Sequence, residues 1–166
     1  MAEPVPSHEV TTTLHLGVRS VTDSSPVALI EKLIAESSSE EQQVLQEVMD
    51  GNGDRAMVFI HRGPSRGARF LITEIGSTIG RAPSNEIFLD DVTVSRSHAS
   101  IKKNGPEFIF TDSGSLNGSY INNQQASTHR LQTGDEIQIG KFHMLFIGRK
   151  IIEGNTSSSN NQSGEK

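Results

Sequence analysis

Two stretches of the sequence combine residue types that bind phosphate. The first, residues 79–98, places Arg81 directly after a glycine and then puts Ser95 and Arg96 side by side in a polar turn, and the second, GSLNGSY at 114–120, holds an Asn-Gly turn. An arginine offers a planar fork to two oxygens, while a serine hydroxyl and the N–H groups of a turn add short, directional donors. None of these groups breaks a bond by itself. The pattern therefore predicts a site that binds a phosphate group and does not transfer it.

Each of these residues has a simpler interpretation when it is taken singly. Arg81 and Arg96 could be ordinary surface charges, and Ser95 could cap a turn. Ser95, His98 and Asp112 also contain the residue types of a hydrolase triad, but the sequence has no nucleophile elbow or oxyanion arrangement. We therefore expect no enzyme.

Metal chemistry has little support in the sequence. Asp90 and Asp91 could offer carboxylates to a metal, but an adjacent pair without further spaced acids predicts side chains on opposite sides of a strand end. The chain has no cysteine, which excludes disulfides, Cys-type zinc sites and a thiol nucleophile. We expect neither a metal nor a cofactor.

Composition limits the size of the core and the kinds of partner. The chain has 166 residues, of which 33% are hydrophobic and 5% aromatic, enough for one modest core with polar sequence left over. A net charge of -5 argues against a nucleic-acid surface, which needs a basic stripe. The start lacks a charged segment followed by an apolar run, and no stretch approaches the length of a membrane span. We expect a soluble, cytoplasmic protein with neither a nucleic-acid nor a membrane partner.

The sequence divides into four parts by composition. Residues 1–26 are rich in Pro, Ser, Thr and acidic residues and predict a disordered tail. Residues 27–54 predict a partly helical spacer, residues 55–150 a β domain, and residues 151–166, rich in Gly, Ser and Asn, a second disordered tail.

Three adjacent threonines, Thr11, Thr12 and Thr13, stand out in the first tail. A lone threonine cluster is more often part of a solvated tail. An exposed, extended hydroxyl is also what a kinase can reach, and a phosphate there adds about −1.5 to −2 charges and three strong acceptors. The cluster is a candidate phosphorylation site.

The spacer carries a helical pattern that breaks near its middle. Ser25 fits an N-cap with Pro26 at the first helical position, and Ser39 with Gln42 fits a capping box. This predicts one broken helix or two short ones. The segment could bind a partner or dimerise, but a partly ordered linker is favoured because helices this short are marginal alone.

From Arg55 onward the pattern changes to that of strands. Short apolar runs alternate with Gly, Asn and Pro turns, which is typical of an all-β sandwich or barrel. The runs are 57–61, 69–72, 78–80, 87–89, 98–103, 108–112, 119–121, 136–139 and 142–147.

Three segments in this region resemble the forkhead-associated (FHA) family. They are GRAPSNEIFLDDVTVSRSHA, DSGSLNGSYIN and LQTGDEIQIGKFHMLF, which give Gly-Arg, Ser-x-x-His, Asn-Gly and Gly-Asp in the family's order. The similarity covers about residues 57–148. It implies an all-β, FHA-type eleven-stranded β-sandwich that binds phosphothreonine through loops at one end.

The resemblance also implies a role for individual residues. Arg81 and Ser95 would hold the phosphate, Arg96 would be a second cation near it, and Asn117 would bond the peptide backbone beside the phosphothreonine. The residues that would shape the supporting loops are Gly80, His98, Leu116 and Gly118.

The order of tail, spacer and single FHA domain resembles a group of actinobacterial metabolic regulators within this family. That resemblance implies that a Ser/Thr kinase phosphorylates a threonine among residues 11–13, which then occupies the protein's own FHA site. The unphosphorylated form would inhibit 2-oxoglutarate dehydrogenase, and glutamate dehydrogenase or glutamate synthase are further candidate partners. About forty residues separate Thr12 from Arg55, roughly 35 Å r.m.s. as flexible coil, so the tail can reach the site.

The alternative is an adaptor that binds phosphothreonines on Ser/Thr kinases or cell-envelope proteins.

Overall fold

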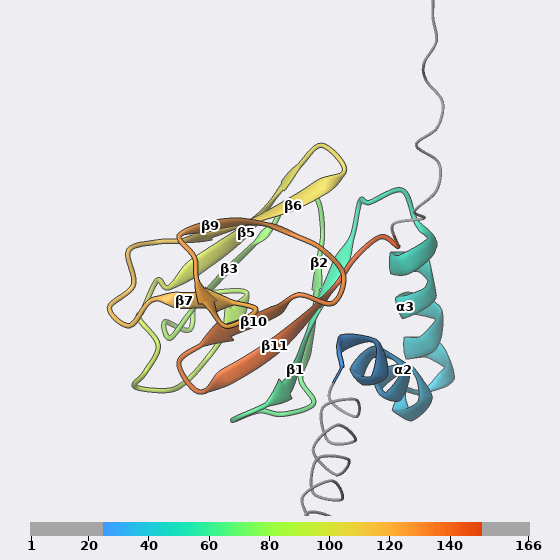
Figure 1. The fold of residues 1–166 in the computed structure, drawn as a ribbon, viewed down its shortest axis with the longest axis horizontal. Coiled ribbons are helices and arrows are strands. Elements are labelled where there is room, and N and C mark those ends of the chain that lie inside the picture. The colour runs from blue at the N-terminus through green and yellow to red at the C-terminus, as the bar shows by residue number, and fades with distance from the viewer. Residues whose placement is uncertain (1–24, 151–166) are drawn as a thin grey trace, which may run out of the picture.

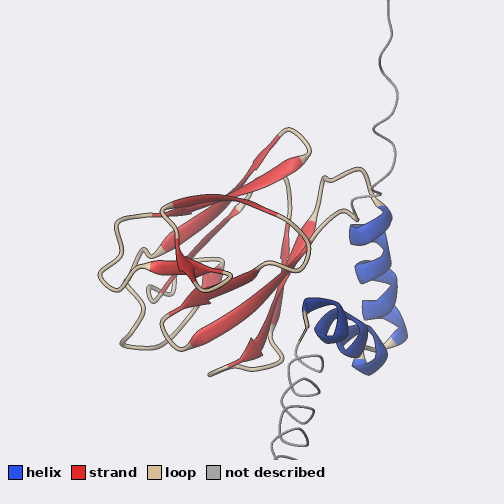
Figure 2. Ribbon diagram, in the orientation of Figure 1, coloured by secondary structure: helices blue, strands red, loops and turns tan. Residues whose placement is uncertain are grey.

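Alternating apolar and polar residues build two sheets that face each other across one core. In the first strand Ala56, Val58 and Ile60 are buried between the sheets, while Met57 and Phe59 point to the other side. Such alternation is what a strand with two different environments requires. The computed structural model describes residues 25–150 (Figures 1 and 2). Residues 1–24 and 151–166, which hold the predicted tails except for Ser25 and Pro26, lie outside these residues, and the threonines at 11–13 lie there too.

The two sheets contain eleven strands, as the family resemblance implied. The six-stranded sheet has the order β2-β1-β11-β10-β7-β8 and the five-stranded sheet the order β4-β3-β5-β6-β9, with β3 and β4 the parallel pair among antiparallel ones. The strands are β1 Ala56–Arg62, β2 Arg69–Ile72, β3 Ser77–Gly80, β4 Ile87–Phe88, β5 Ala99–Asn104, β6 Glu107–Asp112, β7 Ser119–Ile121, β8 Gln124–Gln125, β9 Thr128–Leu131, β10 Glu136–Ile139 and β11 Phe142–Ile147.

The nine predicted apolar runs all occur as strands, with bounds that shift by at most one residue. Two strands, β8 and β9, escaped the prediction. β8 is two exposed glutamines and β9 is THRL, in which only Leu131 is buried. Both are edge strands held by backbone pairing to a neighbour, so they carry little apolar signal.

Within the part of the chain that the structure describes, two helices precede the sandwich. α2 spans Pro26–Glu36, and the Ser25 side chain accepts a hydrogen bond from the N–H of Ala28, as the predicted N-cap requires. α3 spans Ser39–Asp50. The capping box of α3 lies one residue earlier than predicted, on Ser38 and Glu41. Gln42 is used otherwise: its amide donates to carbonyl groups at the end of α2.

These helices pack on the outer face of the six-stranded sheet and form what we call the helical cap, α2 and α3 together (Figure 1). Their buried residues Leu33, Leu45 and Val48 join an apolar cluster with residues of β1 and β11 that point away from the main core, namely Met57, Leu145 and Ile147. The preference for a partly ordered linker was therefore wrong. The apolar face that predicted helices is satisfied by the sheet of the same chain.

Arg69 of β2 ties the helical cap to the sheet. Its guanidinium lies 2.6 Å from the carboxylate of Glu41 and donates to the Ser37 hydroxyl at 3.1 Å. It also lies 5.7 Å from the centre of the Phe59 ring. These polar contacts fix the corner between α2 and α3 against one edge of the sheet.

Candidate functional site

The first part of the site is the sharp chain reversal that follows β3. A Cβ on Gly80 would lie 2.1 Å from the carbonyl oxygen of Arg96, so only glycine lets β3 end this close to the loop before β5. Arg81 comes next, and its backbone N–H donates to the Ser95 carbonyl at 2.9 Å. Its Nε donates to the Val94 carbonyl at 3.1 Å. The guanidinium is thus held by one nitrogen, and its terminal nitrogens are the donors that an anion could take.

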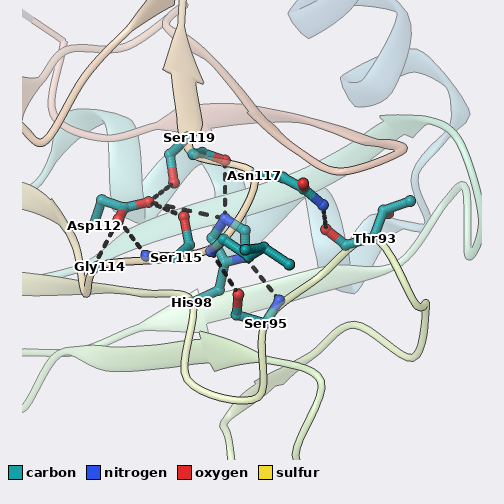
Figure 3. Close-up of polar contacts among 10 residues, drawn as sticks. Thr93, Ser95, His98, Asp112, Gly114, Ser115, Asn117 and Ser119 are labelled. Carbon is teal, nitrogen blue, oxygen red and sulfur yellow. Dashed lines mark hydrogen bonds and ion pairs between the residues drawn. The ribbon is translucent and has the colours of Figure 1, made fainter.

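Ser95 connects this loop to the loop between β6 and β7. Its Oγ accepts a hydrogen bond from the backbone N–H of Leu116 at 3.0 Å, and its backbone N–H donates to Nδ1 of His98 at 3.0 Å (Figure 3). Since Oγ acts as acceptor here, the hydroxyl proton is available for an incoming oxygen. Ser95 and Arg81 therefore share one edge of the sandwich.

Asn117 makes a second link between the same two loops. Its side-chain amide donates to the carbonyl of Thr93 at 3.0 Å (Figure 3). The following Gly118 has φ of 79°, a conformation that favours glycine and turns the chain into β7. The carboxamide is exposed and retains its oxygen and its second N–H for a ligand backbone.

His98 is buried below the loops. Its Nε2 lies 3.0 Å from the carbonyl oxygen of Gly118, and its Nδ1 accepts from the Ser95 N–H. This arrangement requires the neutral imidazole with its proton on Nε2. Burial lowers the pKa of His98, against smaller opposing effects of the Gly118 carbonyl and the Asp112 carboxylate. These contacts place His98 between the two loops, and its loop-ordering role stays a prediction.

Asp112 is a supporting residue that the sequence suggested only as part of a hydrolase triad. One carboxylate oxygen accepts from the N–H groups of Gly114 and Ser115, and the other accepts from the hydroxyls of Ser115 and Ser119 (Figure 3). Burial alone would raise the pKa of Asp112, but these hydrogen bonds outweigh it and lower the pKa. The ionised carboxylate shapes the start of the loop that carries Asn117.

These contacts do not form a triad. The Ser95 hydroxyl bonds to the Leu116 N–H, and the His98 ring faces backbone groups on both sides. Asp112 lies 3.9 Å from Nε2 of His98, outside hydrogen-bonding distance. The geometry is that of a braced binding loop.

Arg96 and Leu116 contribute through their backbones. The carbonyl of Arg96 accepts from the N–H of Ala82 and from the side chain of Asn85, while the Arg96 side chain is exposed beside the site. The Leu116 side chain is 89% exposed, so its part in shaping the loop comes from the N–H that reaches Ser95. The sequence alone did not single out Asn85 as a supporting residue, because an asparagine is ordinary in a Pro-Ser-Asn turn.

Asp91 braces the loop between β4 and β5. Its Oδ1 accepts from both the N–H and the hydroxyl of Thr93, and these hydrogen bonds lower the pKa of the carboxyl. Asp91 is thus committed to its own turn. Across residues 25–150, no group of three or more His, Asp or Glu side chains is placed to hold a metal ion.

The fold and the site together define a two-sheet β-sandwich with hydrogen-bond donors gathered in the loops at one edge, and the comparisons name the family that it resembles. Residues 77–140 match the FHA domain model. This part of the sandwich is thus similar to FHA domains. No helix within residues 25–150 is long and apolar enough to cross a membrane.

Two groups of relatives share about half of the sequence positions that align. An "Oxoglutarate dehydrogenase inhibitor" of Corynebacterium efficiens is 53% identical over 92 residues, which are 55% of this chain and 65% of that protein. The "Glycogen accumulation regulator GarA" of Mycolicibacterium smegmatis is 48% identical over 92 residues, 55% of this chain and 58% of that protein. The chain thus spans less than two thirds of the length of these curated relatives. By their names they are regulators of metabolism.

Solved structures show the same fold. One, from work described as "Structural and functional analysis of phosphothreonine-dependent FHA domain interactions", is 26% identical with a TM-score of 0.52 and covers 55% of this chain and 94% of that chain. "Mycobacterium tuberculosis EmbR in complex with low affinity phosphopeptide" is 26% identical with a TM-score of 0.54 and covers 70% of this chain and 31% of that chain.

Proposed function

We propose that this protein is a non-enzymatic, cytoplasmic regulator that binds phosphothreonine at the loop edge around Arg81 and Ser95. The Arg81 guanidinium and the Ser95 hydroxyl take the phosphate oxygens, Arg96 adds positive charge, and Asn117 bonds the backbone of the bound peptide. One observation carries this proposal above all. The donors come from separate loops that the protein's own hydrogen bonds, Leu116 to Ser95 and Asn117 to Thr93, already hold together. A site ordered in this way loses little conformational entropy on binding.

The second part of the proposal is a switch. A Ser/Thr kinase phosphorylates one threonine of the cluster at 11–13, and the phosphothreonine occupies the FHA site of the same molecule. Metabolic enzymes that bind the unphosphorylated form are then released. The name "Oxoglutarate dehydrogenase inhibitor" of a relative makes 2-oxoglutarate dehydrogenase the first candidate. Glutamate dehydrogenase or glutamate synthase are further candidates, which the family resemblance implies.

A substitution of Arg81 tests the binding site. Charge-assisted hydrogen bonds contribute about 1.5 to 3 kcal/mol each, so loss of two should weaken binding of a phosphothreonine peptide by about a hundredfold or more. Titration of a labelled phosphopeptide into Arg81→Ala measures this. Arg149→Ala is the matched control, since Arg149 is an exposed arginine beyond the far end of β11. Equal affinity of Arg81→Ala and the unsubstituted protein would remove the proposed phosphate contact.

An adaptor that binds phosphothreonines on kinases or cell-envelope proteins is the second candidate. It is favoured by the likeness to a solved FHA domain described as "complexed with the intracellular domain of Rv3910", at 26% identity and a TM-score of 0.51. Activity of 2-oxoglutarate dehydrogenase in the presence of this protein separates the two. Inhibition that tail phosphorylation relieves supports the switch, and no inhibition by either form supports the adaptor.

A further inference from the structure

A groove lies at the end of the sandwich that is far from the candidate site. We call it the end groove, and define it by five of its lining residues, Phe108, Leu131 and Phe146 at the floor and Arg130 and Lys150 at the rim. β6 runs from Glu107 at the groove to Asp112, whose carboxylate holds the loop that carries Asn117. This strand has six residues, so at about 3.4 Å per residue its ends lie roughly 17 Å apart. Figure 1 shows the end of β11 beside α3 and β7 toward the other side of the sandwich, so the end groove and the candidate site are separate surfaces.

The floor of the end groove is apolar. Phe108, Leu131 and Phe146 belong to the main core and also line the groove. The rings of Phe108 and Phe146 lie 6.0 Å apart, centre to centre. The groove has a volume of about 460 Å³, within the range of about 300 to 1,000 Å³ that is typical of ligand pockets. It can therefore take an apolar side chain.

The rim of the end groove is cationic. Three of the lining side chains are positively charged and one, that of Glu107, is negatively charged, in a chain whose formal net charge is -5. Arg130 pairs with Glu107 at 3.0 Å, but both side chains are exposed, so this pair contributes little stability and the guanidinium keeps donors for a second carboxylate. Lys150 is exposed as well. Such a rim favours an acidic partner.

The wall that carries Lys150 is held from two sides. The Thr133 hydroxyl accepts a hydrogen bond from the N–H of Gly148 and donates one to the Gly148 carbonyl, both at 2.9 Å. The N–H of Lys150 donates to the carbonyl of Met49 at 2.8 Å, in the last turn of α3. The groove is therefore formed before a partner arrives, and binding there costs little ordering of the chain.

We propose that the end groove docks an acidic segment of a partner protein. One apolar side chain of that segment, aromatic or leucine, enters the groove, and carboxylates on either side of it pair with Arg130 and Lys150. An apolar anchor in a pocket with a polar rim is the arrangement found at the centre of protein interfaces. Because the end groove is separate from the loops around Ser95, this docking is independent of phosphothreonine binding and goes beyond the proposed function.

Amide chemical shifts of the isotope-labelled full chain test the proposal. The probe is a short, capped peptide with one phenylalanine between aspartates and glutamates. Its titration should shift the amide resonances of Leu131, Thr133 and Gly148 and leave those of Ser95 and Asn117 in place. Two control peptides carry serine for the phenylalanine, or Asn and Gln for the acids. Each should bind at least about tenfold more weakly, because the anchor or the charge is lost.

Two substitutions test the rim. Lys150→Glu reverses a charge and should weaken binding of the acidic peptide by about three- to tenfold. Gln132→Glu adds a negative charge at another exposed position of the groove and should weaken binding in the same direction. The matched control is Lys32→Glu, which makes the same reversal at an exposed position of α2 and should leave binding unchanged. The melting temperature of each variant reports whether the fold is intact.

Several results would refute the docking role of the end groove. These are no binding of the acidic peptide, shifts confined to Ser95 and Asn117, equal affinity for the acidic and the amide peptides, or unchanged affinity in both rim variants. Shifts at Leu131 and Gly148 on dilution of the protein alone would assign the groove to a second copy of this chain and refute it too. The labelled phosphopeptide measures the candidate site separately, so the proposed function stands or fails by its own assay.

Discussion

Replacement of His98 by phenylalanine should separate the bracing of the site from its chemistry. Phenylalanine fills a similar volume but leaves two polar groups without their partners, the N–H of Ser95 and the carbonyl of Gly118. Each unsatisfied buried group costs about 1 to 3 kcal/mol. Because both loops are half-buried and water can reach part of them, we expect the free energy of unfolding to fall by about 2 to 4 kcal/mol.

Urea denaturation measures this loss directly. The chain has one tyrosine and no tryptophan, so fluorescence of Tyr120 reports on β7, the strand that follows the Asn117 loop. The matched control is His129→Phe, since the His129 side chain is 37% exposed and makes a single 3.1 Å contact with the Asp135 carboxylate. Loss of one such hydrogen bond should change the free energy of unfolding by about 1 kcal/mol.

The same variant should also bind phosphopeptide at least about tenfold more weakly, because the loops that carry Ser95 and Asn117 lose their shared support. Titration at a denaturant-free, native condition measures this. If His98→Phe unfolds with the same free energy as the unsubstituted protein and binds peptide equally well, His98 does not hold the loops and the assignment of its hydrogen bonds is wrong.

Three further predictions follow from the same structure. Burial lowers the pKa values of His98 and His61 in the folded protein, so the unfolded chain binds protons more readily. The free energy of unfolding should therefore reach its full value above about pH 6.5 and decline below that pH. Denaturation at pH 7.5 and pH 5.5 measures the decline, which His98→Phe should make smaller. Gly80→Ala should weaken phosphopeptide binding and lower the melting temperature, because its Cβ would lie 2.1 Å from a backbone oxygen. Leu33→Ala should cost about 2 to 3 kcal/mol of unfolding free energy but leave the affinity of the unphosphorylated chain for phosphopeptide unchanged, since Leu33 belongs to the helical cap.

The central strands could be predicted from the sequence because each carries its own apolar signal. β8 and β9 could not be predicted, because each forms a strand only by backbone pairing, β8 with β7 and β9 with β6. Nothing in Gln124–Gln125 reveals that pairing. The helices were predictable from their spacing, but their docking was not. The amphipathic face of a helix shows that the helix packs against something, but not against what. Met57 and Leu145 look like ordinary core residues in the sequence, because the sequence does not show that they point to the outer face of the sheet.

The candidate site divides in the same way. The Arg81 and Ser95 residue types suggested a phosphate site, but a serine three residues before a histidine defines no geometry by itself, and only the structure shows that the Ser95 N–H donates to His98. The Asp112 carboxylate accepts hydrogen bonds from the hydroxyls of Ser115 and Ser119 in the loop that follows it. Residue types alone do not distinguish this role of an aspartate from its role in a hydrolase triad. The capping box lies one residue before the predicted position because Gln42 donates instead to carbonyl groups at the end of the preceding helix. That contact depends on how the two helices pack, which the sequence does not show.

The proposed intramolecular switch would also limit which partners it can control. Closure with an effective concentration near millimolar and an intrinsic Kd near micromolar favours the closed form about a thousandfold. A partner competes through the ratio of its own concentration to its Kd. At a concentration of about 10 μM, an enzyme bound with Kd below about 10 nM would stay bound after phosphorylation, and one with Kd above about 10 μM would hardly bind beforehand. Only partners between these limits can be released, so the regulated enzyme should bind the unphosphorylated protein with intermediate affinity.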